Sequence, residues 1–423
     1  AGAPVREIVE SYRRCRPLPP FNYLPQLLGV GAPHFREVDT WDSHYHVQHL
    51  ALPSGSSYDD LLRLVADLHE PMLDRHRPLF RCWVIDGVPG NRFAIYTKTH
   101  HSIIDGVSGL KKLYEGLSTS TERTIPTPAF ALPTPEPPPA PPHPGLHRLL
   151  DTIHSAVVQV GTVNQISLSA ARKAVSAALG SHVEGSLPFV APHAPTNAPA
   201  QQARGFATLS VPLAEMHRIA RQHHATLNDV AAAIIDHGLH AYLRQAGQAY
   251  AHELVAMCPV SLRDDSDSAV GTRVSALFVR LGRPEATMTD RLREVVHSVA
   301  SAKDELGAMS TNAAMTFAVA LVALAGAGAS THLDRVGHPA CNLVISNIPG
   351  NTEPHYLNGA PLIGIFPVSA LAASIGLNVT LSSYCDTMNF GFVTNTAAIS
   401  DVQALAEFTG KAYAELTAES ARA

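Results

Sequence analysis

A proline-rich segment divides this sequence more sharply than any other feature. Ten prolines lie between Thr124 and Pro144, at positions 126, 128, 133, 135, 137, 138, 139, 141, 142 and 144. Proline fixes its own φ and removes a backbone donor, so this spacing excludes both a regular helix and a central strand. We therefore predict a linker here, with folded structure on either side of it.

The length of the chain favours two lobes, because 423 residues exceed the usual size of a single hydrophobic core. A second passage rich in Pro, Ala and Gly runs from Gly185 to Gly205, and a helical insert is expected before it, from His147 to Leu179. We predict an N-terminal lobe at residues 1–123, a crossover at 124–205 and a C-terminal lobe at 206–423.

Hydrophobic spacing predicts helices and strands in both lobes, and hence a mixed α/β fold. Tyr58–Leu73 carries apolar residues at helical spacing, Arg92–Thr99 alternates as a strand does, and a helical stripe resumes at Val107. A closing helix is expected to begin with Ser400 as its N-cap and Asp401 in its first turn. The C-terminal lobe should also contain a helix at 226–245 and strands at 254–261, 274–281, 342–348, 375–383 and 388–394.

Composition and charge narrow the possible partners. Apolar residues make up 46% of the chain and charged residues 16%, which is typical of a globular protein with a large core. The net charge is -5 and no basic run occurs, which argues against nucleic acid as a partner. The five cysteines are scattered without any C-x-x-C pair, so neither a disulfide framework nor a thiolate metal site is expected.

The chain carries no sign of secretion or of a membrane span. Ala1–Glu10 lacks the apolar core of a signal peptide, and the absent initiating Met suggests that an upstream segment was either removed or left out. The longest nearly uncharged stretch, Ala313–Ala329, is shorter than the roughly 20 residues that span a bilayer. We interpret it as a buried helix, the alternative being a helix in the membrane surface. We expect a cytoplasmic protein that contacts an inner membrane or lipid droplet only peripherally.

The segment His100–Gly106, with the sequence HHSIIDG, carries the most specific chemical signal. A match to H-H-x-x-x-D-G is expected by chance on the order of 0.004 times in such a chain. Transfer of an acyl group from a thioester to a hydroxyl needs a group that accepts the hydroxyl proton and returns it to the departing thiolate. Imidazole does both near neutral pH, so the motif predicts acyl transfer.

The end of this motif is interpreted as a scaffold. Asp105 can fold back under the imidazole turn while an arginine from elsewhere neutralises its charge, and Gly106 supplies a permissive backbone where a strand turns into a helix. The alternative is a metal site. It requires both imidazoles to face one ion, whereas adjacent side chains of a strand point to opposite faces. We therefore expect no metal.

Together with blocks elsewhere, the motif makes the chain resemble the wax ester synthase/diacylglycerol acyltransferase family. This family is a branch of the CoA-dependent acyltransferases, which also include chloramphenicol acetyltransferase and the condensation domains of peptide synthetases. The matching blocks follow one another along nearly the whole chain, at residues 19–22, 41–53, 73–80, 100–106, 228–230, 259–263, 346–350 and 364–368.

The resemblance implies a two-lobed, chloramphenicol acetyltransferase-like α/β fold with mixed sheets and a channel between the lobes. Acyl-CoA and an alcohol or diacylglycerol would meet there at His101, which the resemblance makes the catalytic base, with His100 as a packing or orienting residue. It also places Asn228 and Asp229 near the reaction centre. Because Thr226 and Asp229 have the spacing of a capping box, a purely structural interpretation competes there.

The chain departs from the family pattern in two places. The family's Pro-Leu-Trp block ends here in Phe80, which keeps an aromatic channel wall but lacks the indole donor. The first strand that usually precedes Ala1 is missing, which would point to a processed chain. A second pair, His223-His224, has no Asp-Gly at the right spacing and is expected on a solvated helix end.

Further residues of the site are predicted from the matching blocks. Arg263, which follows a strand, is the expected partner of Asp105, with Arg273 as the alternative. A tight turn at Pro349-Gly350 fits the sequence as well as a place on the channel does. Hydrogen-bond donors along the channel are predicted at Ser346, Asn347 and Asn378.

These inferences predict an O-acyltransferase that moves a long-chain acyl group from acyl-CoA to a fatty alcohol or diacylglycerol. Acyl-CoA is then a substrate, and no cofactor is expected. The chain has no G-x-S-x-G elbow, which is consistent with direct transfer without an acyl-enzyme. Two alternatives are a condensation-domain or polyketide-associated enzyme that uses a carrier-protein thioester, and a lipid-binding coat protein without activity.

Overall fold

A computed structural model of the chain describes residues 2–26, 34–134, 191–198, 203–261, 274–307, 338–371 and 374–422. The chain forms two compact units. Unit 1 comprises Ala1–Pro138, Ile348–Ile365 and Ser382–Asp386, and unit 2 comprises Pro139–Asn347, Phe366–Leu381 and Thr387–Ala423. The helix expected at 147–179, the nearly uncharged stretch 313–329, and both candidate arginines, Arg263 and Arg273, lie outside the described residues.

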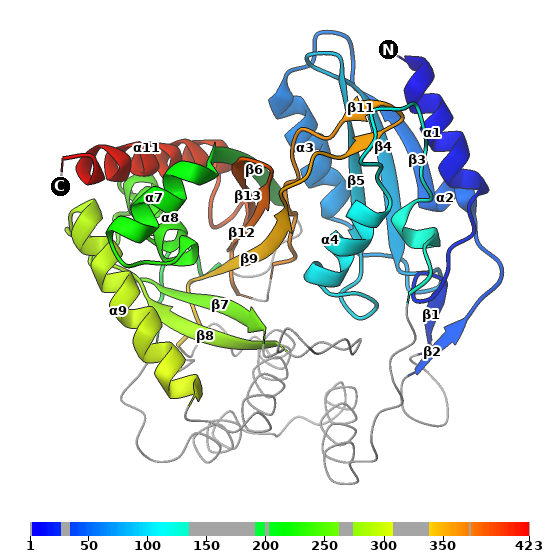
Figure 1. The fold of residues 1–423 in the computed structure, drawn as a ribbon. Helices are drawn as coiled ribbons and strands as arrows, with labels where there is room; N and C mark the ends of the chain where they lie inside the picture. The colour runs from blue at the N-terminus through cyan, green and yellow to red at the C-terminus, as the bar shows by residue number, and fades with distance from the viewer. Residues whose placement is uncertain are drawn as a thin grey trace. The chain divides into compact units, whose positions relative to one another are not determined.

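Unit 1 is built on a mixed three-stranded sheet (Figure 1). Its order is β3 (Val47–Ala51), β4 (Phe80–Val88) and β5 (Arg92–Thr99), with β3 parallel and β5 antiparallel to β4. Strand β5 has the bounds that its alternating pattern predicted.

Two helices cover opposite faces of this sheet. Helix α1 (Gly2–Arg14) packs on β3 and β4, where Phe80, Cys82 and Val84 share its core. Trp83, which lies between Cys82 and Val84, points to the other face of the sheet. Its ring stacks on that of Tyr96, with 5.3 Å between the ring centroids. The Tyr96 hydroxyl is in turn hydrogen-bonded to Nδ1 of His69, at 2.8 Å, and His69 is the last residue of α3 (Tyr58–His69). The alternation of β4 therefore assigns α1 and α3 to different faces.

The remaining elements of unit 1 are short. They are β1 (Tyr23–Gln26), β2 (His34–Glu37), α2 (Ser43–His46), α4 (Gly106–Glu115), the 3-10 turn η1 (Ala129–Ala131), β10 (Tyr356–Leu357) and β11 (Ala360–Pro361). The first part of the proline-rich segment contains only η1, whose Phe130 is buried. The prediction that this segment excludes regular helix and strand is confirmed for residues up to 134.

Unit 2 contains most of a six-stranded mixed sheet. Its order is β6 (Arg204–Pro212), β13 (Thr387–Asn395), β12 (Leu377–Tyr384), β9 (Leu343–Asn351), β7 (Val255–Ser261) and β8 (Val274–Arg280). β7 runs parallel to β9 and antiparallel to β8, and β6 is antiparallel to β13. The last residues of β9 and β12 belong to unit 1.

Helices α7 (Leu213–Gln222), α8 (Leu227–Gln245), α9 (Met288–Gly307) and α11 (Val402–Ser420) share the main hydrophobic core with this sheet (Figure 1). Helix α8 packs against α9 and α11 and is buried over most of its length. None of the described helices combines the length and the apolar composition needed to cross a bilayer.

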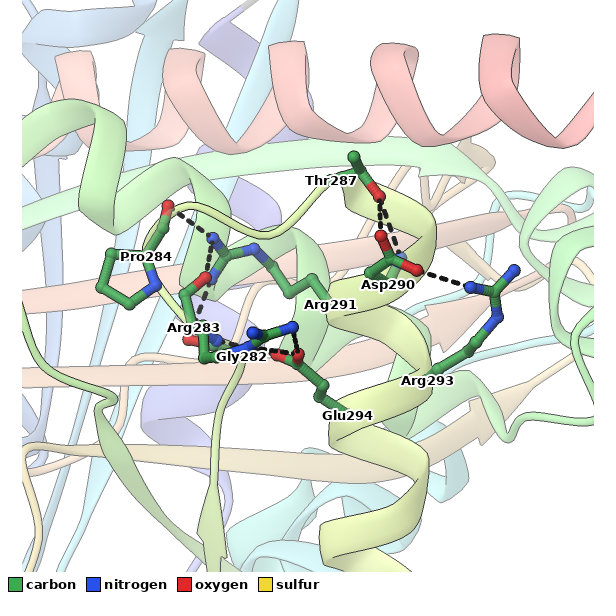
Figure 2. A network of polar contacts seen from close by, with 8 residues as sticks. All are labelled: Gly282, Arg283, Pro284, Thr287, Asp290, Arg291, Arg293 and Glu294. Carbon is green, nitrogen blue, oxygen red and sulfur yellow. Dashed lines mark hydrogen bonds and ion pairs between the residues drawn. The ribbon is translucent and has the colours of Figure 1, made fainter.

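One buried ion pair joins α8 to α9. Asp236 and Arg291 are both fully buried, and the Arg291 guanidinium donates to the Asp236 carboxylate. Arg291 also donates to the carbonyl oxygens of three successive residues in the loop before α9, namely Gly282, Arg283 and Pro284 (Figure 2). The cation therefore fixes the start of α9 as well as its contact with α8.

Two predicted local structures are wrong. Pro349 and Gly350 lie within strand β9 and form no tight turn. Gly350 is required there by close backbone packing, since a Cβ atom would lie 1.6 Å from the carbonyl oxygen of Ser383. The closing helix begins one residue later than expected, because Asp401, and not Ser400, is its N-cap and accepts from the Ala404 N–H.

Candidate active site

The motif lies at a strand-to-helix junction of unit 1, as predicted. Strand β5 ends at Thr99 and α4 begins at Gly106. The His100 N–H donates to the carbonyl oxygen of Leu79 at 3.0 Å, and the Ile103 N–H donates to that of His100 at 3.0 Å. The first bond anchors the turn to the loop before β4, and the second closes the turn itself.

The His100 ring takes part in the turn through its Nδ1 atom. The Ser102 N–H donates to Nδ1 at 3.2 Å, and the Ser102 hydroxyl lies 2.7 Å from the same atom. The pKa of His100 is lowered by partial burial, and then by the positive charges of Arg75 and His101. Burial and these two charges therefore favour the neutral ring, while the role of His100 in the reaction stays a prediction.

His101 differs from its neighbour because its side chain is exposed and uncommitted. Within the described part of the chain it forms no hydrogen bond and no ion pair. Of the two imidazoles, His101 is thus the one that is free to exchange a proton with a substrate. Its role as catalytic base stays a prediction at this point.

Asp105 is the N-cap of α4. Its Oδ1 accepts from the Ser108 N–H at 2.8 Å, and its Oδ2 accepts from the Ser108 hydroxyl at 3.1 Å. These contacts fit a scaffold, although the capping role was not anticipated. Gly106 is required for close packing and not for an unusual φ, since a Cβ atom there would lie 2.9 Å from Ile348 Cδ1.

Asn228 and Asp229 lie at the start of α8 in unit 2. The capping box is confirmed, because Asp229 Oδ2 accepts from the Thr226 N–H at 2.7 Å and Thr226 Oγ1 accepts from the Asp229 N–H at 3.2 Å. Asn228 Oδ1 accepts from Asn347 Nδ2 of β9 at 2.8 Å. The structure therefore joins two of the matching blocks, while their closeness to the reaction centre stays a prediction.

The other predicted site residues occupy the sheets. Asn378 on β12 is buried, donates to the Ala370 carbonyl at 3.0 Å and accepts from the Thr380 hydroxyl at 2.9 Å. Ser346 is half-buried in β9. Phe80 is 2% exposed and stacks on His46 at 4.6 Å in the core of unit 1. Their predicted places along a channel stay predictions.

Sequence reasoning missed the two serines that shape the motif. Ser102 follows His100 by two residues, and Ser108 follows Asp105 by three, which is the spacing between an N-cap and the third helical residue. The spacing between Asp105 and Ser108 could therefore have predicted the N-cap from the sequence. The other pair, His223-His224, does lie at the end of α7, where His224 is exposed and His223 Nε2 lies 2.9 Å from Ser420 Oγ.

Solved structures define the class of fold. The first condensation domain of the CDA synthetase matches with a TM-score of 0.52 and 16% sequence identity, covering 99% of this chain and 88% of that one, which shows the fold alone. The wax ester synthase/diacylglycerol acyltransferase of Marinobacter aquaeolei VT8 matches with a TM-score of 0.76 and 26% identity, covering 99% and 92%. The fold is therefore the two-lobed α/β fold of the CoA-dependent acyltransferases.

Sequence comparisons define the family. The wax ester synthase/diacylglycerol acyltransferase catalytic domain matches residues 1–231, and the C-terminal domain of the same family matches residues 270–417. A putative diacylglycerol O-acyltransferase of Mycobacterium tuberculosis is 33% identical over 99% of this chain and 91% of its own length. The O-acyltransferase WSD of Acinetobacter baylyi is 31% identical, over 95% and 86%. The chain belongs to the wax ester synthase/diacylglycerol acyltransferase family and is an acyltransferase.

Proposed function

We propose that this protein transfers a long-chain acyl group from acyl-CoA to a fatty alcohol or a diacylglycerol, with His101 as general base. The products are a wax ester or a triacylglycerol, together with free CoA. The single observation that carries the assignment of the base is the contrast within the motif. His100 and Asp105 are both bonded to neighbouring residues, whereas the exposed His101 ring has no bonding partner within the described residues.

The proposed reaction needs one proton acceptor and no covalent enzyme intermediate. His101 takes the proton of the acceptor hydroxyl while the oxygen attacks the thioester carbonyl carbon. The tetrahedral intermediate then collapses, the carbon–sulfur bond breaks, and the departing thiolate takes the proton back from His101. An imidazole near neutral pH suits both transfers, and the base is restored at the end of each turnover.

The experiment is an assay of the purified protein with palmitoyl-CoA and hexadecanol. We expect free CoA, measured with a thiol reagent, and hexadecyl palmitate, measured by mass spectrometry, in equal amounts. CoA release should need the alcohol, because no acyl-enzyme forms in its absence. A burst of CoA without acceptor, or CoA release without ester, would contradict the proposal.

The preferred acceptor is tested by competition. Hexadecanol and dioleoylglycerol are offered together with palmitoyl-CoA, and the two esters are separated and counted. The proposal expects at least one of them to form, and their ratio defines the acceptor preference. If neither forms while a carrier-protein thioester supports transfer, the proposed donor is wrong.

Fatty alcohols and diacylglycerols are insoluble in water, which bears on where in the cell the reaction takes place. We infer that the protein associates peripherally with a membrane or lipid-droplet surface, where such acceptors are available. In a flotation assay with vesicles that contain dioleoylglycerol, a fraction of the protein should float with the lipid. Complete recovery of an active protein in the lipid-free fraction would refute this part.

A further inference from the structure

A surface cavity of about 520 Å³ lies in unit 1, between α1 and the turn that joins β10 to β11 (Figure 1). Three of the residues that line it are arginines. Arg6 and Arg14 belong to α1, and Arg123 precedes the 3-10 turn η1. None of the lining residues belongs to the motif, so the proposed reaction does not account for this group of cations.

The turn between β10 and β11 joins the two walls of the cavity. The Asn358 N–H donates to the Thr124 carbonyl oxygen at 2.8 Å, which ties the turn to the segment that carries Arg123. The Asn358 side-chain amide donates to Glu7 Oε2 of α1 at 3.1 Å. This one residue therefore holds the helix and the segment of Arg123 around the same opening.

The stem of Arg123 is placed by the other residue of this turn, Gly359. A Cβ atom at Gly359 would lie 3.2 Å from Arg123 Cγ and 3.3 Å from the Thr121 carbonyl oxygen. The glycine therefore leaves room for the arginine stem to lie against the turn, while the side chain lines the cavity. The position of Arg123 thus follows from packing and not from an ion pair.

The three arginines, which we call the arginine cluster, are exposed. Within the part of the chain that the structure describes, the side chains of Arg6, Arg14 and Arg123 form no ion pair and no hydrogen bond. A guanidinium has five N–H donors in a planar fork and stays charged at every physiological pH. The cluster therefore presents unused donors and positive charge along one cavity.

Two carboxylates share the cavity, and both have other partners. Glu10 lies 3.4 Å from the Arg13 guanidinium, and Glu7 accepts from the Asn358 amide. The Glu10–Arg13 pair is neutral as a whole, and Glu7 offsets only one of the three charges of the cluster. An excess of positive charge remains, which favours an anionic ligand.

The spacing of the cluster indicates the kind of anion. Arg6 and Arg14 are eight residues apart on one helix, which corresponds to about 12 Å along its axis. A single phosphate is too small to contact both, whereas the phosphates of neighbouring lipids form an array that reaches each arginine separately. Arginine binds phosphate through paired hydrogen bonds, and anionic lipid surfaces attract groups of basic residues.

We propose that the arginine cluster binds the phosphate headgroups of anionic phospholipids and thereby holds the protein on the lipid surface. The inference rests on the proposed peripheral association of the enzyme, for which it supplies the binding surface. Fatty alcohols and diacylglycerols reside in that surface, so binding through the cluster brings unit 1 next to the acceptor. The contact is electrostatic and weakens as salt is added.

The experiment is flotation of the full chain with vesicles of phosphatidylcholine, with or without phosphatidylglycerol, and without acceptor or acyl-CoA. The protein should bind the vesicles with phosphatidylglycerol more strongly, and added salt should reduce the difference. One basic residue near an anionic leaflet changes binding about fivefold, so Arg123→Gln should lower the partition coefficient by about that factor. The triple variant Arg6→Gln, Arg14→Gln, Arg123→Gln should lower it roughly 100-fold.

Arg221→Gln is the matched control, because it removes the same charge elsewhere. Arg221 is an exposed residue of α7 in unit 2, and its side chain has no ion pair within the described residues. Arg123→Lys keeps the charge and should keep most of the binding. The proposal is overturned if the cluster variants bind as Arg221→Gln does, or if phosphatidylglycerol does not strengthen binding of the unmodified protein.

CoA is the soluble source of the same chemistry, because it also carries several phosphates. Its binding is measured by calorimetry in the absence of lipid. We expect Arg123→Gln to bind CoA as Arg221→Gln does, and weaker binding by Arg123→Gln would make the cavity a substrate site and reject the lipid assignment. None of these readouts depends on turnover, so failure of the proposed reaction would be recognised separately in the ester assay.

Discussion

Replacement of Arg291 by methionine removes the cation of the buried ion pair between α8 and α9. Asp236 and Arg291 have no measurable exposure, so the carboxylate that remains cannot be hydrated without a rearrangement of the core. Loss of one partner of such a pair costs about 3–5 kcal/mol. The carbonyl oxygens of Gly282, Arg283 and Pro284 also lose a donor, so we expect the upper part of this range (Figure 2).

The loss should depend on pH in a definite direction. Burial raises the pKa of Asp236 to about 7 even with Arg291 present, and removal of the cation can only raise it further. A carboxyl whose folded pKa lies above its unfolded value adds stability at low pH and loses it as pH rises through the folded pKa. The defect of Arg291→Met should therefore be largest at about pH 8 and smaller at about pH 5.5.

The measurement is urea unfolding followed by circular dichroism, with hydrogen exchange of α8 and α9 as the local readout. Arg283→Gln is the control, since Arg283 pairs with Glu294 on the surface, where water screens the charges, and its loss should change the stability little. Replacing the pair as a whole, by Asp236→Leu with Arg291→Met, should recover part of the stability. If Arg291→Met at pH 8 is no less stable than Arg283→Gln, the reasoning is wrong.

Two further predictions concern the folding stability of the protein. Gly350→Ala should destabilise by about 2–4 kcal/mol in chemical unfolding, because its Cβ would lie 1.6 Å from the Ser383 carbonyl oxygen. A Cβ atom at Gly109 would lie 3.9 Å from its nearest neighbour, so Gly109→Ala should have little effect on the stability or raise it slightly. Burial, and then the charge of Arg291, lowers the pKa of the buried His240 to about 4, so protonation of this ring should cost up to about 3 kcal/mol of folding stability as pH falls from 6.5 to 4. His240→Gln should lose less stability over that range, and an equal loss would refute the assignment.

Local sequence patterns were sufficient for several elements. The alternation of Arg92–Thr99 and the capping box at Thr226 gave the bounds of β5 and the start of α8 because both depend on neighbouring residues alone. Helix α3 ends at His69, before the expected Leu73, since Pro71 cannot continue it. The extended backbone at Pro349-Gly350 depends on a partner strand far away in the sequence, which no local pattern reveals.

The candidate site shows the same division. The motif identified the chemistry, because the residue types and their spacing are specific to it. The bond between Leu79 and His100 arises from the pairing of β4 with β5, and it was not predicted. Likewise, the capping role of Asp105 depends on where α4 begins. Residue identity thus indicated the candidate base, and the tertiary structure was needed to find the hydrogen bonds that fix the turn around it.

The central claim is tested most directly by the rate of ester formation in His101→Asn, with palmitoyl-CoA and hexadecanol at neutral pH. His224→Asn is the matched control, because His224 is an exposed histidine outside the motif with a positive φ that asparagine tolerates. Loss of a positioned general base should lower kcat by roughly 10²–10⁴-fold while the protein stays folded, and the control should keep its rate. Turnover in His101→Asn within a few-fold of the control would contradict the account.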